Sequence, residues 1–312
     1  MLVPSDDFSN KISEHLKSIS QSCQNLKNDP LLSSKKISSS IFDFSVIASD
    51  GGIIYERLFG FDLFLIRSSC VYFNYKQNKL EEFEYFPSKL PPINPLLLDS
   101  FDEGESQKLK SLLRLKEELS ITLKCAKEKL PRIILLDGSI VPLPSDRPEK
   151  SSSLFPLFEE IISLYRELYF ISSQNNILLC AVVKDSRSKS VSSRFDLNFN
   201  DVVLFDNLLE GNSSSSIFDL TEKFGFSDFS FKFFYLKPTS SSLPLRIEFL
   251  SLNFDFDIVS TINSLCHLGL DYPPPLIEAD LCATIEPNEL ENFKKSLPLE
   301  LRPLRRNSRL FR

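Results

Sequence analysis

The segment RIILLDGS, residues 132–139, constrains the fold more than any other part of this sequence. It follows Pro131 and is almost entirely apolar until it reaches Asp137 and Gly138. A short apolar run of this kind is typical of a strand in the middle of a sheet, where both faces are covered. The preceding residues, from about 105 to 129, carry a leucine-rich stripe at helical spacing and predict a long amphipathic helix. Together these two elements favour a layered α/β domain.

The rest of the chain predicts further helices and strands. Helical spacing predicts helices over 8–27, 154–173 and 255–268. Runs of β-branched and aromatic residues predict strands over 41–49, 61–67, 70–75 and 177–184, and a hairpin formed by 229–237 and 244–252. We expect 61–67 and 70–75 to be antiparallel neighbours. The Ser- and Lys-rich segment 33–40 and the proline-rich segment 85–101 are expected to be irregular connections.

Composition narrows the functional classes. The 312 residues are 42% hydrophobic and 25% charged, as in ordinary globular proteins, and no apolar run reaches the roughly 20 residues of a membrane helix. With a net charge of −6, any nucleic-acid partner must meet local basic patches. The six separated cysteines are expected to be reduced core thiols, and two histidines are too few for a multi-histidine zinc site. With no secretion signal visible, we expect a cytoplasmic protein.

Two acidic residues occupy equivalent positions at the ends of predicted strands. Asp50 follows SVIAS and precedes Gly51 and Gly52, and Asp137 follows IILL and precedes Gly138. Each motif alone is consistent with an ordinary Asp-Gly turn, although ligands of α/β folds bind at this edge of the sheet. If the two strands are neighbours, the carboxylates lie side by side and repel each other unless a cation neutralises them. Carboxylate oxygens are ligands that suit Mg²⁺ or Mn²⁺.

The order of the acids along the chain indicates a reaction class. Glu117 and Glu118 lie on the predicted helix between the two Asp-Gly motifs, and Asp280 comes late, near an expected helix start. Strand Asp, helix Glu, strand Asp and a late helical acid is the order found in RNase H-like nucleases. In those enzymes two metal ions activate water and stabilise the leaving oxygen of a phosphodiester.

Seven segments resemble, in the same order, motifs of the NurA nuclease family of archaea and bacteria. The resemblance runs from about residue 40 to 290 and is carried by DFSVIASDGG, LLRLKEEL, IILLDGSIVPLP, LLCAVVKDSRS, NDVVLFDNLLEGNSSS, LRIEF and GLDYPPPLIEADLCATI. The second segment resembles the family's Arg-x-x-x-Glu helix, with Arg114 and Glu118. The resemblance implies an α/β fold, namely an RNase H-like mixed sheet flanked by helices, with N- and C-terminal helical additions. We expect an N-terminal helix and linker (1–40), a nuclease domain (41–290) and a basic C-terminal tail (291–312).

Three departures from the family pattern concern the site. Gly52 stands where the family usually has Ser, and we expect little harm because no carboxylate is lost. Asp271 separates Leu270 from Tyr272 and interrupts the family's Gly-Tyr-Pro motif. Asp280 lies where many members carry His, and since Asp is a good ligand for Mg²⁺ or Mn²⁺, we expect this change to tune the metal choice without abolishing activity.

The resemblance also implies which residues form the site. Four acids would bind the metal and act in catalysis, namely Asp50, Glu118, Asp137 and Asp280, and Tyr272 would act beside them. Glu117 remains a rival of Glu118, because both flank the leucine stripe of the helix. Helix capping is the alternative role of Asp280, and Tyr272 has the alternative of an ordinary buried aromatic residue.

Basic residues after the predicted strand 177–184 are candidates for DNA contacts. Lys184 is a candidate for the scissile phosphate, and Arg187, Lys189 and Arg194 are candidates for the DNA backbone. Their alternative is a solvated charged loop. The arginine-rich residues 302–312 are a candidate nucleic-acid or partner tail, or a frayed terminus. Asp201 and Glu248 are expected to hold loops or strands.

The resulting hypothesis is a metal-dependent DNA nuclease. By resemblance we expect 5′-to-3′ exonuclease activity, often with single-strand endonuclease activity, a Mn²⁺ or Mg²⁺ cofactor and a homodimer. The resemblance also implies a HerA-type hexameric ATPase as partner and a role in DNA-end resection during double-strand-break repair. The alternatives are a catalytically quiet NurA-like subunit that docks on the ATPase, an RNA-cleaving enzyme on the same fold, and an Asp-nucleophile phosphatase, whose DxDxT-like motif is absent from the sequence.

Overall fold

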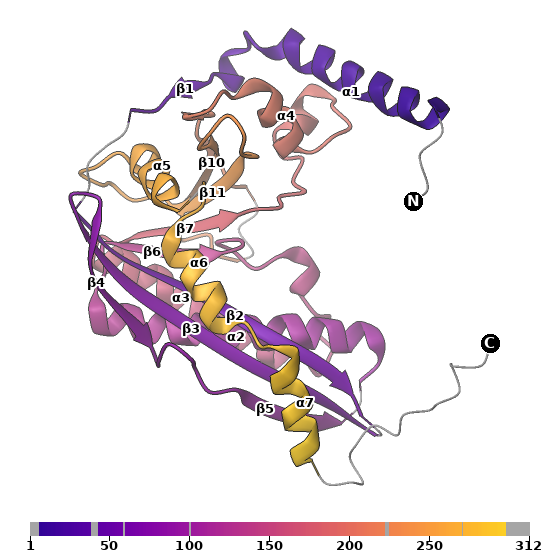
Figure 1. Ribbon diagram of the computed structural model, residues 1–312, viewed down its shortest axis with the longest axis vertical. Coiled ribbons are helices and arrows are strands. Elements are labelled where there is room, and N and C mark those ends of the chain that lie inside the picture. Colours follow the sequence, from indigo (N-terminus) through magenta and orange to yellow (C-terminus); the bar gives the residue numbers. More distant parts are fainter. Residues whose placement is uncertain are drawn as a thin grey trace.

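One mixed sheet organises the molecule. The computed structural model describes residues 6–38, 43–58, 60–99, 101–221, 225–269 and 271–297. Within these ranges eleven strands join in the order β1-β8-β10-β11-β7-β6-β2-β3-β4, with β5 added to β3 and β9 to β10 (Figure 1). The strands are β1 Lys35–Lys36, β2 Ser45–Arg57, β3 Phe61–Lys76, β4 Lys79–Phe86, β5 Asn94–Asp99, β6 Ile133–Asp137, β7 Leu178–Val183, β8 Ser213–Ser214, β9 Phe218–Asp219, β10 Phe231–Lys237 and β11 Leu245–Leu250.

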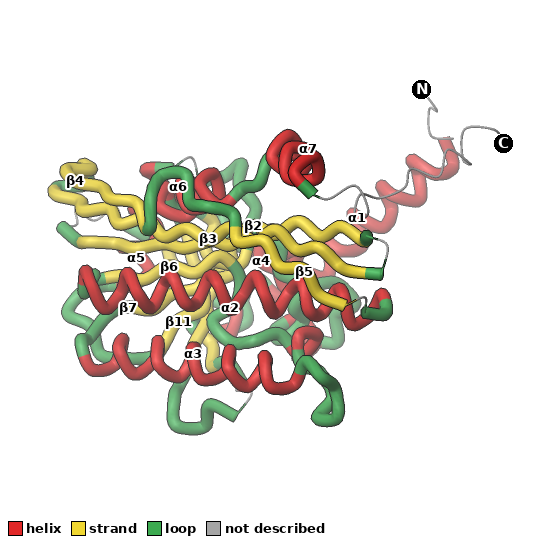
Figure 2. The backbone as a smooth tube through the Cα atoms, turned by 90° about the horizontal axis from the view of Figure 1, so that it is seen from below, coloured by secondary structure: helices red, strands yellow, loops and turns green. Residues whose placement is uncertain are grey.

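Helices cover both faces of this sheet, which confirms the predicted fold class. They are α1 Asp6–Leu26, α2 Glu103–Lys129, α3 Phe155–Gln174, α4 Asp201–Leu208, α5 Ile258–Leu268, α6 Pro274–Ala283 and α7 Pro287–Ser296. Helices α2 and α3 lie on one side of the strands, and α6 and α7 lie on the other (Figure 2). Among the described residues, no helix has both the length and the apolarity required to cross a bilayer.

The buried strand β6 lies at the centre, as its apolar sequence predicts. It pairs in parallel with β2 on one side and with β7 on the other. Ile134 and Leu136 pack into the core beneath α2 and α3, whereas Ile133 and Leu135 pack into the core beneath α5 and α6. Because side chains alternate along a strand, a four-residue apolar run can fill both cores. Each of these buried side chains stabilises the fold by roughly 1.5–3 kcal/mol.

Helix α2 has the length that its leucine stripe predicts. Its start is capped by Asp102, whose carboxylate accepts a hydrogen bond from the Glu105 N–H at 2.8 Å. Acidic residues in the first turn and lysines in the last turn complement the helix dipole. The helix ends at Lys129 because Leu130 adopts a left-handed conformation directly before Pro131.

Strands β2 and β3 correct two sequence predictions. Strand β2 does not end before Asp50 but runs on to Arg57, and the segments 61–67 and 70–75 form one continuous strand instead of two neighbours. Strand β2 pairs with β3 along its whole length, and the outer edge of β3 is covered by β5 over Phe61–Ile66 and by β4 over Cys70–Lys76. Backbone pairing with neighbouring strands thus extends along β2 and β3 past the residues that the apolar pattern marks as strands.

Three further differences lie in the connections and near the C-terminus. The proline-rich segment 85–101 contains β5, which pairs with β3 alone among the described strands and therefore tolerates Pro95. Lys35 and Lys36 form the short strand β1 inside the segment 33–40. Helix α7 begins with a capping box between Glu286 and Glu289. It continues across position 290, where the sequence predicts the end of the nuclease domain and the start of the tail. The arginine-rich residues 302–312 lie outside the described residues.

The remaining predicted elements agree with the structure to within a few residues. Helices α1, α3 and α5, strand β7 and the β10–β11 hairpin all form where the sequence predicts them. All six cysteines are buried and free, as expected for reduced core thiols.

Candidate active site

The register of the central strands places Asp50 and Asp137 side by side. Ser49 of β2 is paired in parallel with Leu136 of β6, and the two aspartates are the next residues on their strands. The β2–β6 pairing ends there, while β2 continues beside β3 alone. Asp50 therefore lies at the edge left by the end of β6, although it is in the middle of its own strand. It is 8% exposed, and its Oδ1 accepts a 2.7 Å hydrogen bond from the Gly51 N–H.

Helix α2 brings Arg114 and Glu118 to this edge. The two residues are four apart and share one face of the helix, with Arg114 Nη1 at 3.1 Å from Glu118 Oε2 and 3.7 Å from Asp50 Oδ1. Gly51 permits this approach, because a Cβ there would lie only 3.0 Å from Arg114 Cγ. Glu118 is 2% exposed, whereas Glu117 is half-buried on a different face. The structure therefore places Glu118, and not its rival, beside Asp50.

Helix α6 supplies Asp280 from the opposite face of the sheet. The sequence pattern predicts this residue near a helix start, but the helix begins at Pro274, which suits a first helical position, so Asp280 lies near its end. Asp280 is exposed, and its side chain is within hydrogen-bonding reach of Asp50. Gly52 allows α6 to pack this closely, because a Cβ at position 52 would lie 2.1 Å from the Ala283 carbonyl oxygen.

The Asp137 carboxylate is held by two predicted site residues. Lys184, just after β7, donates from Nζ to Asp137 Oδ2 at 2.9 Å. Tyr272, between α5 and α6, donates from its hydroxyl to Asp137 Oδ1 at 3.3 Å. Lys184 Nζ also lies 4.3 Å from the centroid of the Tyr272 ring, a cation–π distance. Five residues from distant parts of the chain, Asp50, Glu118, Asp137, Lys184 and Tyr272, therefore gather at one place with Asp280.

The gathered acids shift their own protonation equilibria. Burial raises the pKa of Glu118 to about 8, and the charges of Asp50 and Asp137 add to the effect while Arg114 opposes it. Burial raises the pKa of Asp50 to about 6, with further contributions from Asp137 and Asp280. Burial, and then the neighbouring Asp137, also raises the pKa of Tyr272. Charged carboxylates are thus disfavoured here unless more positive charge is present.

The acids match a divalent cation in donor chemistry and in charge, but they do not form a finished cage. Four carboxyl groups stand near two cationic side chains, Arg114 and Lys184. Oxygen donors of this kind suit Mg²⁺ or Mn²⁺. In the described part of the chain, no three His, Cys, Asp or Glu side chains are gathered into a metal-binding cluster. The carboxylates would therefore have to close around a bound ion.

The predicted DNA-binding residues lie in three different places. Arg187 and Lys189 line a cavity of about 670 Å³ that borders the Asp137 loop, residues 138–143, which follows β6. Arg194 instead donates from Nε to the Ser190 carbonyl oxygen and stacks on the Phe218 ring, and it does not line this cavity. Lys184 belongs with the acids, as described above. Of the three candidates for contacts with the DNA backbone, Arg187 and Lys189 therefore line the cavity and Arg194 does not.

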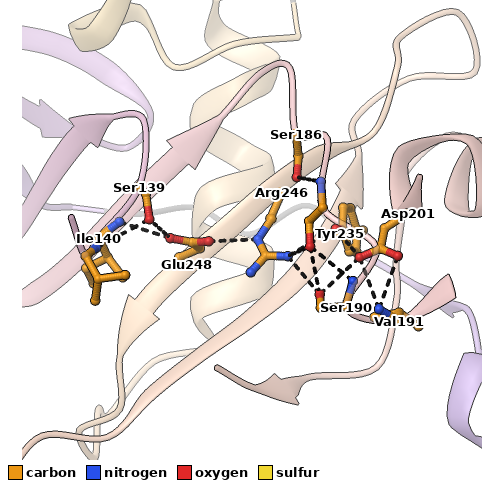
Figure 3. A network of polar contacts seen from close by, with 11 residues as sticks. Ser139, Ile140, Ser186, Ser190, Val191, Asp201, Tyr235, Arg246 and Glu248 are labelled. Carbon is orange, nitrogen blue, oxygen red and sulfur yellow. Dashed lines mark hydrogen bonds and ion pairs between the residues drawn. The ribbon is translucent and has the colours of Figure 1, made fainter. Parts of the chain in front are cut away.

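Arg246, which was not predicted from the sequence, joins the two sides of a buried polar network (Figure 3). Its Nε donates to Glu248 Oε1 at 2.7 Å, and Glu248 Oε2 accepts from Ser139 Oγ at 2.8 Å. On the other side, Asp201 accepts hydrogen bonds from the Val191 and Ser192 N–H groups. Glu248 and Asp201 thus have the structural roles expected of them. The sequence does contain a signal for this ion pair. In the strand LRIEF, Arg246 and Glu248 carry opposite charges and, being two residues apart, share one face of the strand.

Comparison with known proteins agrees with this geometry. The NurA domain family model matches residues 44–284. The crystal structure of the NurA nuclease from Sulfolobus solfataricus is similar over 92% of this chain and 92% of its own, with a TM-score of 0.63 and 17% identity. A crystal structure of NurA bound to dAMP and manganese is similar over 96% of this chain and 99% of its own, with a TM-score of 0.57 and 11% identity. No curated protein matches the chain significantly. Since the family model covers most of the sequence, the chain belongs to the NurA nuclease family.

Proposed function

We propose that this protein is a divalent-metal-dependent deoxyribonuclease. The observation that carries the proposal is the convergence of Asp50, Glu118 and Asp137 at the edge where β6 ends. Burial and mutual repulsion leave this group short of positive charge, which a divalent cation would supply. The similarity to a NurA structure containing dAMP and manganese supports the same chemistry.

In this proposal four acids hold Mn²⁺ or Mg²⁺, namely Asp50, Glu118, Asp137 and Asp280. The bound ion would activate water and stabilise the leaving oxygen of the phosphodiester. Arg114 keeps Asp50 and Glu118 near each other, since its Nη1 contacts both carboxylates. The raised pKa values of Asp50 and Glu118 make ion binding pH-dependent, because both carboxyls must lose their protons to act as ligands.

Two neighbours of Asp137 would orient the substrate and the acid. Tyr272 donates a hydrogen bond to Asp137 and fixes the direction of its carboxylate. Lys184 contacts the other oxygen, and its side chain is 44% exposed, so it can reach a phosphate at the mouth of the site. Its positive charge would then bind the scissile phosphate. The buried strands β2 and β6 hold Asp50 and Asp137 in place.

The finer parts of the proposal follow from the family. We infer 5′-to-3′ exonuclease activity on DNA together with endonuclease activity on single strands. We also infer a homodimer, a HerA-type hexameric ATPase as partner, and a cytoplasmic role in DNA-end resection during double-strand-break repair. The symmetric dimer is also the commonest oligomer among soluble proteins.

Incubation with end-labelled DNA tests the proposal directly. Single- and double-stranded DNA, labelled at either end, is incubated with the protein in Mn²⁺, in Mg²⁺ and in EDTA. A 5′-to-3′ exonuclease releases the 5′ label at once as a mononucleotide and shortens 3′-labelled DNA progressively. Asp50→Asn and Asp137→Asn should both be inactive. Asp219→Asn is the matched control, because Asp219 is an exposed acid on β9 that takes no part in the site.

The outcomes separate the alternatives. Cleavage that depends on the metal and is lost in both site variants supports the nuclease. No cleavage by the folded wild-type protein with either ion, alone or with a HerA-type ATPase, would favour the quiet subunit. Cleavage of RNA in preference to DNA would favour the RNA-cleaving alternative. Equal activity of Asp137→Asn and Asp219→Asn would reduce the Asp-Gly motif to a structural turn.

A further inference from the structure

The cavity of about 670 Å³ next to the acids is lined by both polar and apolar residues. The polar lining residues are Ser139, Asp185, Ser186, Arg187, Ser188, Lys189, Ser190, Ser193, Arg246 and Glu248. The apolar lining residues are Val141, Pro142, Leu143, Pro144, Val183 and Leu220. Residues 139 and 141–143 also line the smaller cavity of about 80 Å³ that contains Glu118 and Asp137. The large cavity is therefore separated from the acids by a single stretch of chain.

Arg246 is a buried cationic residue that lines this cavity. The residue is 4% exposed, and besides Glu248 it contacts Ser188 Oγ at 3.0 Å and Ser190 Oγ at 3.1 Å through Nη1. Its guanidinium also stacks on the Phe233 ring at 3.9 Å from the centroid. Among the described residues, no group accepts a hydrogen bond from the second terminal nitrogen, Nη2 (Figure 3). This buried arginine, which lines the cavity, thus keeps donor capacity at Nη2.

The charges around the cavity favour an anion. Three cationic side chains line it, Arg187, Lys189 and Arg246, against two acids, Asp185 and Glu248. Glu248 is already engaged with Arg246 at 2.7 Å. Arg187 and Lys189 are exposed, and Lys189 Nζ donates to the Asn198 carbonyl oxygen at 3.1 Å, a contact that it would exchange for a ligand. Guanidinium groups, hydroxyls and ammonium groups together are typical phosphate donors.

The shape of the cavity favours a nucleotide over a bare ion. Its volume is within the range of cavities that hold small organic ligands. The phosphate would contact the cationic lining residues, and a sugar or base would pack against Val141, Pro142 and Leu220. Glu248 connects Arg246 to the Asp137 loop, because it accepts hydrogen bonds from Ser139 Oγ and the Ile140 N–H. A ligand here would be aligned with the acids by one rigid network.

We propose that this cavity is a second phosphate subsite, which binds a neighbouring phosphodiester of the strand whose scissile phosphate lies at Asp50 and Asp137. The inference rests on the proposed nuclease function for the identity of the ligand. Arg187 and Lys189 bind the phosphate through their exposed cationic groups, Arg246 binds it through Nη2, and the apolar lining residues contact the attached nucleoside. The substrate strand is thereby gripped on one side of the bond to be cleaved.

Binding in EDTA tests this subsite without requiring cleavage. The ligand is a fluorescently labelled single-stranded decanucleotide, and the dissociation constant is measured by anisotropy at several salt concentrations. The variant is Arg187→Gln/Lys189→Gln, because both residues are exposed, whereas removal of Arg246 would disturb the core. The matched control is Lys124→Gln/Lys127→Gln, which removes the same charge from exposed positions of α2 that do not line the cavity.

The Arg187/Lys189 variant should weaken binding roughly tenfold, and the slope of log K against log salt should fall by about 0.7 for each phosphate that the variant no longer binds. The control variant should bind within about twofold of the wild type. If the Arg187/Lys189 variant and the control variant weaken decanucleotide binding equally, the subsite is overturned, because binding then depends on the overall charge of the protein and not on this cavity. Equal affinity for free dAMP and for the decanucleotide would overturn the assignment to a strand.

The same proteins in Mn²⁺ distinguish this proposal from the proposed function. An Arg187/Lys189 variant that binds the decanucleotide like the wild type, in a protein that cleaves DNA, refutes the subsite and leaves the nuclease standing. Selective loss of binding in a protein that never cleaves DNA supports a site for a strand phosphate in this cavity and refutes the nuclease.

Discussion

Replacement of Glu118 by Gln tests whether this buried carboxyl limits the stability of the metal-free protein. Burial raises the pKa of Glu118 to about 8 in the folded protein, compared with about 4.3 in an unfolded chain. The folded state therefore binds the proton more tightly than the unfolded state. The stabilisation due to this proton is complete below about pH 4 and is lost as the pH rises to about 8.

The size of the effect follows from these two values. Each tenfold change in proton affinity is worth about 1.4 kcal/mol, so the upper limit of the loss is about 5 kcal/mol across this range. Glu118→Gln keeps the shape of the side chain and removes the titration. The wild type should therefore lose stability between pH 5 and pH 8, and the variant should not lose this contribution. The free energy of unfolding of the variant minus that of the wild type should thus increase by several kcal/mol over this range.

Urea unfolding in EDTA at pH 5, 6.5 and 8 measures this difference. Glu117→Gln is the matched control, since Glu117 is the half-buried neighbour on the same helix. Its difference from the wild type should be nearly the same at the three pH values. Mn²⁺ at about 100 times its dissociation constant should restore about 2.7 kcal/mol to the wild type at pH 8, and less to Glu118→Gln. A Glu118→Gln protein that loses stability with pH as steeply as the wild type would refute this reasoning.

Three further substitutions and the oligomeric state provide independent tests. Asp137→Asn should lower cleavage at least about a hundredfold while DNA binding measured by anisotropy persists, and a near-normal rate would contradict the role of this carboxylate. Gly52→Ser, which restores the usual family residue, should lower the free energy of unfolding by about 1–3 kcal/mol because its Cβ meets the Ala283 carbonyl, and an unchanged urea midpoint would show that α6 can shift. Glu289→Gln should cost about 1–3 kcal/mol in the same assay, because Glu289 accepts bonds at 2.6 and 3.1 Å from the buried Arg67; a variant as stable as the wild type would show that this ion pair contributes nothing. Light scattering at micromolar concentration should give about twice the chain mass of 35.7 kDa, and a monomer at every concentration would contradict the dimer.

Local patterns determined much of the architecture. The leucine stripe of α2, the apolar run of β6 and the β10–β11 hairpin are visible in the sequence because helix and strand periodicity depends on residues close together in the chain. The Asp-Gly motifs are local as well, and together with the family motifs they indicated the acids that the fold gathers. The parallel β2–β6 pairing then accounts for the proximity of Asp50 and Asp137.

Only the tertiary structure decided how far the strands extend and what surrounds the acids. Strands β2 and β3 continue past their apolar segments because they find backbone partners in each other and in β4 and β5, which no local pattern encodes. The close packing of α6 against Gly52 and the position of Asp280 depend on contacts between segments more than 200 residues apart. In the sequence, Arg246 is only a charged residue within a predicted strand. It lines a cavity because β11 pairs with β7, which brings Arg246 close to the loop that follows β7. Non-local pairing and the burial of charges are properties of the folded chain, and for that reason the sequence identified the acids but not the cavity beside them.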